Sequence, residues 1–135
     1  MSDKYFLDSN VIVYAHTDLD IAKQQVAQQI IAARNTIVST QVLQETANIL
    51  SKKFHFEWPD IQKVLQETAG NNLLHVNTAS TIADACRIAQ RYGFSFYDSL
   101  IISAALEIGA RILYSEDLQD GQVIDGVMTI QNPFK

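Results

Sequence analysis

Short apolar runs alternate along the chain with longer stretches in which apolar residues recur every three or four positions. The short runs are typical of buried strands, and the periodic stretches are typical of amphipathic helices. The predicted strands are Tyr5–Leu7, Thr36–Val38, Leu73–Val76 and Arg111–Tyr114, with Val127–Ile130 as a short edge strand. The predicted helices run from Asp18 to Ala33, from a cap at Ser39 or Thr40 to about Lys53, from Trp58 to near Gly70, from a cap at Thr78 through Tyr92, and from Asp98 to near Gly109.

Strands that alternate with helices favour parallel pairing through right-handed crossovers. We therefore expect a three-layer α/β/α sandwich with a mainly parallel central sheet of four to five strands. The chain has 135 residues, 5 glycines and 2 prolines, and it contains no repeat or Pro/Gly-rich linker. Residues 1–135 are accordingly predicted to form a single domain.

Composition narrows the class of protein. A net charge of −5 argues against a protein that coats nucleic acid through a basic face, but it leaves a carboxylate-based enzyme open. Cys86 is the only cysteine, so no intramolecular disulfide can form, which fits a reducing compartment. Because neither a signal peptide nor a membrane-length apolar stretch is present, we expect a cytoplasmic protein without a membrane partner.

Two acidic residues follow predicted strands. Asp8 comes directly after the first strand, and Asp117 lies just beyond the fourth. Ligands of parallel α/β sheets bind beyond the carboxyl ends of the strands, so both side chains are expected at the same edge. The alternative for Asp8 is an ordinary turn residue. The alternative for Asp117 is a solvated acidic loop, which is the favoured interpretation for Glu116 and Asp120.

Two further acids lie in predicted helices. Asp98, at a helix start, points into the apolar arc and away from the polar sector formed by Ser99, Ser103 and Glu107. Its alternative role is an N-cap. Glu45 lies just beside the apolar face of its own helix, where the alternative is a boundary glutamate that reaches solvent.

Carboxylates gathered from four segments require a compensating charge. Two carboxylates about 4 Å apart repel by about 4 kcal/mol at an effective dielectric constant of 20. Hard oxygen ligands favour Mg²⁺ or Mn²⁺ over zinc. Such an ion can orient a water molecule and polarise a scissile phosphate. No glycine-rich phosphate loop is present, which disfavours an NTPase.

Four segments resemble the motifs of the PIN domain family in the family's order, with the closest similarity to VapC-type ribonuclease toxins of toxin–antitoxin systems. They are Phe6–Tyr14, Gln44–Glu45, Tyr97–Leu106 and Leu113–Gly121, and the stretch from Ala85 to Leu106 is specific in combination. The resemblance implies a PIN-like fold and a Mg²⁺- or Mn²⁺-dependent endoribonuclease of a type II toxin–antitoxin pair. It assigns the catalytic and metal-binding roles to Asp8, Glu45, Asp98 and Asp117.

The same resemblance assigns supporting roles to Asn10 and Ser115. The last motif departs from the family pattern because Asp120 is present as well as Asp117, so either is open as the fourth acid, with Asp117 preferred and Asp120 as an outer group. Members of the family form homodimers and are silenced by a small antitoxin protein. An RNA substrate, an antitoxin and a second copy of the chain are therefore the expected partners.

Two other functions stay open. One is a PIN-fold nuclease with a housekeeping or DNA substrate, and the other is a non-catalytic RNA-binding or regulatory module. The candidate RNA-binding cations are Arg34, Lys52, Lys53, Arg87, Arg91 and Arg111, although a solvated surface explains most of them. Phe56 and Trp58 are candidates for base stacking. Core packing, or a partner groove over Phe54–Trp58, is the alternative.

Overall fold

A computed structural model describes residues 3–135 as six helices and six strands. The strands are β1 (Tyr5–Leu7), β2 (Thr36–Ser39), β3 (Leu73–His75), β4 (Ile112–Tyr114), β5 (Val123–Ile124) and β6 (Met128–Gln131). The helices are α1 (Ser9–His16), α2 (Ile21–Ala32), α3 (Thr40–Lys52), α4 (Trp58–Asn71), α5 (Ala79–Tyr92) and α6 (Phe96–Glu107). No helix among the described residues is long and apolar enough to cross a membrane.

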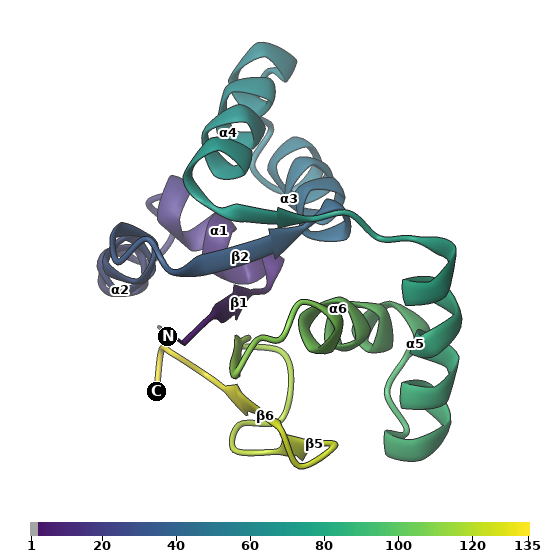
Figure 1. The fold of residues 1–135 in the computed structure, drawn as a ribbon. Coiled ribbons are helices and arrows are strands. Elements are labelled where there is room, and N and C mark those ends of the chain that lie inside the picture. The colour runs from purple at the N-terminus through teal and green to yellow at the C-terminus, as the bar shows by residue number, and fades with distance from the viewer. Residues whose placement is uncertain (1–2) are drawn as a thin grey trace.

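The strands form one sheet in the order β3-β2-β1-β4-β6-β5, and every pair is parallel except the antiparallel pair β5–β6. Figure 1 shows α1 and α2 on one side of the sheet and α5 and α6 on the other. The predicted three-layer sandwich with a mainly parallel sheet is confirmed. The sheet is wider than the expected four to five strands because β5, only two residues long, leaves no periodic signal in the sequence.

The order of the strands reverses at β1. From β1 the chain continues to β2 and β3 on one side, and β4 is then added on the opposite side of β1. Phe6 of β1 pairs with Ile37 of β2 and with Leu113 of β4, so β1 is central and covered on both faces. The crevice beyond the carboxyl ends of two such strands is the usual ligand site of an open α/β sheet.

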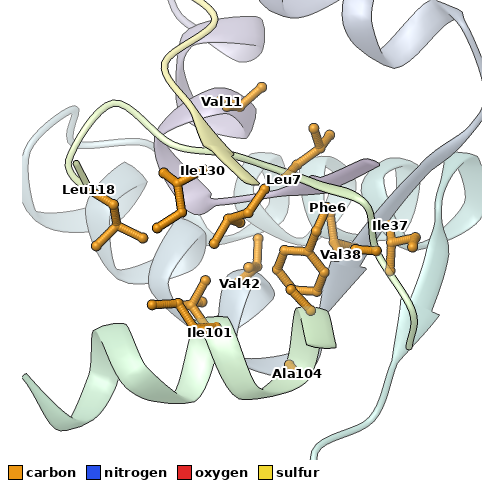
Figure 2. Packing of buried hydrophobic residues seen from close by; sticks show 14 of the residues in the cluster. Phe6, Leu7, Val11, Ile37, Val38, Val42, Ile101, Ala104, Leu118 and Ile130 are labelled. Atoms are coloured by element: carbon orange, nitrogen blue, oxygen red, sulfur yellow. The ribbon is translucent and has the colours of Figure 1, made fainter. Parts of the chain in front are cut away.

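The main core lies between the sheet and the helices. Figure 2 shows Phe6 of β1 close to Val38 of β2 and directed toward Ala104 of α6. All three side chains are fully buried. A smaller cluster between α3 and α4 contains Leu50, Ile61 and Val64, with Phe54 and Phe56 packed against it.

Helix α1 was not predicted from the sequence. The run Val11–Val13 consists of β-branched residues, which locally favour a strand. In the structure Val11, Ile12 and Val13 are buried, and α1 packs against both α2 and α3. Tertiary packing therefore overrides the local preference, and Asp8 caps this helix instead of forming an isolated turn.

Helix α6 begins two residues earlier than predicted. Ser95 is its N-cap, since the Ser95 hydroxyl accepts from the Asp98 backbone N–H, so the N-cap alternative for Asp98 is wrong. The polar sector of α6 forms the contact with α5. The Ser103 hydroxyl donates to the Thr81 carbonyl at 2.8 Å, and the Glu107 carboxylate accepts from the Thr81 hydroxyl at 2.8 Å.

The core assignment makes a stability prediction for two isoleucines in helices of the same layer. Ile101→Ala in α6 removes a side chain that is 2% exposed, and it is expected to cost about 2–5 kcal/mol of the free energy of unfolding. Ile82→Ala in α5 is the matched control, because Ile82 is 44% exposed and its truncation is expected to cost less than about 1 kcal/mol. Urea titration measures both variants, and equal losses would contradict the packing described.

Candidate active site

Asp8 occupies the carboxyl end of β1 and caps α1. Its Oδ1 accepts from the Ser9 backbone N–H at 2.7 Å, and its Oδ2 accepts from the Ser115 hydroxyl at 2.8 Å. Ser115 follows β4 and is fully buried, while Asp8 is 6% exposed. The Asp8–Ser115 hydrogen bond therefore joins the ends of the two strands between which the strand order reverses.

Asp117 lies in the loop after β4, which is held by hydrogen bonds to Ser115 and Asn10. Its backbone N–H donates to the Ser115 hydroxyl at 3.2 Å, and its carboxylate accepts from the Asn10 amide at 3.2 Å. The Asn10 carbonyl in turn accepts from the backbone N–H of Glu116 at 3.3 Å. Asn10 and Ser115 thus fix the position of the loop relative to α1.

Glu45 and Asp98 are brought together by the amide of Gln41. Gln41 Nε2 donates to the Glu45 carboxylate at 3.2 Å and to the carbonyl of Tyr97 at 3.0 Å. Gln41 is buried in the first turn of α3, and Tyr97 directly precedes Asp98 in the first turn of α6. This bridge sets the start of α6 against the start of α3.

All four predicted acids line one open cleft with a volume of about 310 Å³; they are Asp8, Glu45, Asp98 and Asp117. Ser9, Asn48 and Ile49 complete the lining, and the sequence analysis did not identify these three. A helical spacing would have indicated Asn48, since it lies one turn after Glu45 on α3. Ser9 could not be found in this way because α1 itself was not predicted.

The cleft carries uncompensated negative charge. None of the ion pairs within residues 3–135 involves the four acids. Burial, with the neighbouring charges of Glu45 and Asp117, raises the pKa of Asp8 to about 7 against the hydrogen bonds from Ser115 and Ser9. Burial, with the charges of Asp98 and Asp117, also raises the pKa of Glu45.

The chemistry of these side chains fits a hard divalent cation. The four acids supply only oxygen donors, which such ions prefer. A cation would also offset the charges of Glu45 and Asp117, which add to the effect of burial on the pKa of Asp8. Within residues 3–135, however, no three His, Cys, Asp or Glu side chains stand at the mutual spacing of a preformed cation site. The oxygen donors are therefore of the type that a hard divalent cation prefers, and binding of the ion would draw the side chains inward across the open cleft.

Two other acids of the same loop have different surroundings. Glu116 is half-buried, where it accepts from the Tyr14 hydroxyl at 2.8 Å and pairs with Lys23 at 2.7 Å, so its interpretation as a solvated residue is wrong. Asp120 accepts from the backbone N–H of Asn132 at 2.8 Å and lies outside the lining of the cleft. Asp117 is thus the acid of this loop that reaches the cleft.

The raised pKa of Asp8 predicts how the stability of the metal-free protein depends on pH. Between the ordinary value of 3.8 and about 7, the folded protein holds a proton that the unfolded chain releases. The contribution of Asp8 to the free energy of unfolding is therefore fully present below pH 3.8 and is lost as the pH rises through about 7. Because one pKa unit corresponds to about 1.4 kcal/mol, the full loss is on the order of 4 kcal/mol.

Asp8→Asn removes this titration, so in the presence of a chelator it is expected to flatten the pH profile of stability and to exceed the wild type in stability at pH 8. Asp117→Asn is the control and should keep most of the profile, because burial is the largest cause of the Asp8 shift. Urea titrations at a series of pH values provide the measurement. An unchanged profile in Asp8→Asn would show that another group is responsible.

The sequence and the fold were compared with those of known proteins. The PIN domain model matches residues 5–119, from β1 to just beyond Asp117. A search of curated proteins finds no match. Thirteen chains of solved structures match the fold.

Two of these structures illustrate the similarity. The crystal structure of VapC20 from Mycobacterium tuberculosis, described as a sarcin-ricin loop cleaving toxin, has a TM-score of 0.71 and 18% identity, with coverage of 84% of this chain and 90% of that chain. FitAcB from Neisseria gonorrhoeae has a TM-score of 0.60 and 17% identity, with coverage of 96% and 98%. At these identities the similarity shows a shared fold. Since the family model itself spans most of the sequence and includes all four acids of the cleft, the chain belongs to the PIN domain family.

Proposed function

We propose that the protein is a Mg²⁺- or Mn²⁺-dependent endoribonuclease that acts in the cytoplasm as the toxin of a type II toxin–antitoxin pair. The observation that carries the proposal is the cleft in which Asp8, Glu45, Asp98 and Asp117 meet without a cationic partner among the described residues. A PIN domain with this acid set has the donors for metal-assisted hydrolysis of a phosphodiester bond.

The same four carboxylates would hold the divalent ion. When bound, the ion would orient the attacking water molecule and polarise the scissile phosphate. Ser115 and the Ser9 backbone fix both oxygens of Asp8, and Asn10 fixes Asp117. These hydrogen bonds restrict Asp8 and Asp117 before an ion or a substrate binds, which reduces the reorganisation needed at these two residues.

The toxin assignment and the RNA substrate are supported by the similarity of the fold to VapC20, whose description as a toxin that cleaves the sarcin-ricin loop applies to that protein. We also propose a small antitoxin protein as the partner and a homodimer as the assembly, both on the resemblance of the sequence motifs to VapC-type toxins. Incubation of the purified protein with tRNA, mRNA and single-stranded DNA separates an RNA substrate from a DNA substrate.

Asp98→Asn tests the catalytic assignment. Loss of an outer-shell group in a metal site costs about 10–100-fold, so the loss of a direct carboxylate ligand is expected to reduce Mn²⁺-dependent RNA cleavage by more than about 100-fold. The matched control is Asp60→Asn, which changes an exposed aspartate in the first turn of α4. Circular dichroism checks the fold of both variants. Cleavage by Asp98→Asn at the wild-type rate would overturn the assignment.

The pKa of Asp8 predicts that Mn²⁺ competes with a proton. Because the pKa of the buried carboxyl is raised to about 7, Mn²⁺ affinity should increase by roughly tenfold between pH 6 and pH 8, and binding should release protons below pH 7. Isothermal calorimetry in buffers with different ionisation enthalpies measures both quantities. Absence of binding at millimolar Mn²⁺ at pH 8 would contradict the proposed metal site.

A further inference from the structure

Two hollows adjoin the acid cleft on either side, and both are lined by the same helix, α3. The first, here called the Tyr97 hollow, has a volume of about 270 Å³ and shares Glu45 and Asn48 with the cleft. The second, here called the Phe54 hollow, has a volume of about 280 Å³ and shares Ile49 and Asp117 with the cleft. The three spaces are therefore contiguous.

The residues that α3 contributes to these spaces lie along one face. They begin with Gln41 and Gln44 in the Tyr97 hollow and continue with Glu45, Asn48 and Ile49 in the cleft. Lys53, the C-cap directly after α3, follows in the Phe54 hollow. Gln41, Glu45, Ile49 and Lys53 recur every four residues, with Gln44 and Asn48 beside them, which is the spacing of a single helix face. At about 1.5 Å per residue, the span from Gln41 to Lys53 is about 18 Å, so the groove extends past the acids at both ends.

The Tyr97 hollow has the chemistry of a nucleobase site. The side chain of Tyr97 is 66% exposed, and its ring packs edge-on against Phe96 with 5.4 Å between the ring centroids. The exposed amides of Gln44 and Asn48 lie in the same hollow and can both donate and accept hydrogen bonds. An exposed ring stacks on any base, and neighbouring amides can bind base edges.

The Phe54 hollow combines an aromatic ring with a cation. The ammonium group of Lys53 lies 5.7 Å from the centroid of the Phe54 ring. Among the ion pairs of residues 3–135, none uses Lys53, whereas Glu116 in the same hollow is neutralised by Lys23 at 2.7 Å. This end of the groove therefore offers an unneutralised positive charge to a phosphate.

We propose that the groove along α3 binds single-stranded RNA, with one base stacked on Tyr97, the scissile phosphate at the four acids, and the next nucleotide in the Phe54 hollow with its phosphate near Lys53. The inference rests on the proposed function and adds the path of the strand and the residues that hold it. A base reaches a hollow of this size only when it is unpaired and unstacked, because the bases of a duplex are enclosed in the helix. Duplex RNA is therefore excluded from this path.

The test measures the Kd of a labelled single-stranded RNA by fluorescence anisotropy in millimolar Mg²⁺. All further substitutions are made in the Asp98→Asn variant, here called the background, because it should not cleave the RNA. Tyr97→Ala is expected to raise the Kd by about 5- to 150-fold, the usual effect of removing one base–aromatic stack. Tyr97→Phe, which keeps the ring, should stay within about twofold of the background. Trp58→Ala is the matched control, since Trp58 is 68% exposed on α4 and lies outside the three spaces.

Lys53 is tested by the dependence of binding on salt. Lys53→Ala is expected to reduce the slope of log Kd against log salt concentration by about 0.7, the value for one phosphate contact on a single strand. Lys63→Ala on α4 is the control and should leave the slope unchanged, because Lys63 is exposed away from the groove. The same RNA annealed to its complement should bind at least about tenfold more weakly.

The outcomes separate this inference from the proposed function. The first outcome is that the wild type cleaves RNA, Tyr97→Ala binds RNA as tightly as the Asp98→Asn background, and Lys53→Ala keeps the salt slope. This would overturn the proposed RNA groove without affecting the proposed nuclease activity. The groove would then hold a different occupant, such as a protein partner. Single-stranded binding that depends on Tyr97 and Lys53, without cleavage or Mn²⁺ binding by the wild type, would support the groove and overturn the nuclease. Absence of RNA binding by the background protein and by the wild type would overturn the groove.

Discussion

The buried carboxylate of Asp8 is the group on which the arrangement of the site depends. It ends a central strand that is covered on both faces, so the fold removes it from water in either protonation state. Within residues 3–135, hydrogen bonds from Ser9 and Ser115 stabilise its charge, while the charges of Glu45 and Asp117 oppose it. The folded protein therefore carries an electrostatic cost at neutral pH that a bound cation would relieve.

The topology of the sheet explains why this cost is concentrated at one place. Because β4 pairs with β1 on the side opposite to β2, the segments that follow β1 and β4 lie side by side. The Ser115–Asp8 hydrogen bond spans 107 positions of the chain and closes this junction. Both carboxylates at the junction therefore depend on a contact between distant parts of the sequence.

Helix α3 connects the acids to the surface around them. Its buried first turn positions Gln41, which holds Glu45 and the start of α6, and its exposed face continues past the cleft to Lys53. A single helix thus sets Glu45, the start of α6 and the proposed RNA path relative to one another. Such coupling suits a nuclease because a phosphate must meet both the acids and the flanking contacts in one orientation.

The sequence by itself determined the order of most elements, the three-layer fold and the acids that reach the cleft. Apolar periodicity and the position of Asp8 and Asp117 after strands are local signals, and the rule for parallel sheets converts them into a common edge. The motifs around Glu45 and Asp98 added the two helical acids. The positions of the strands, helices and helix faces require only spacing along the chain, whereas a common role for the four acids was implied by the resemblance to the PIN domain family.

Only the tertiary structure decided the remaining features. The β-branched run Val11–Val13 lies in helix α1 because burial outweighs its local preference for a strand. Glu116 is half-buried because Tyr14 and Lys23 lie next to it in the fold. Asn48 lines the cleft, and Lys53 the groove, because α3 packs against α1 and β2. Each of these outcomes depends on which distant groups meet, and the free energy of such contacts is not contained in any local stretch of the sequence.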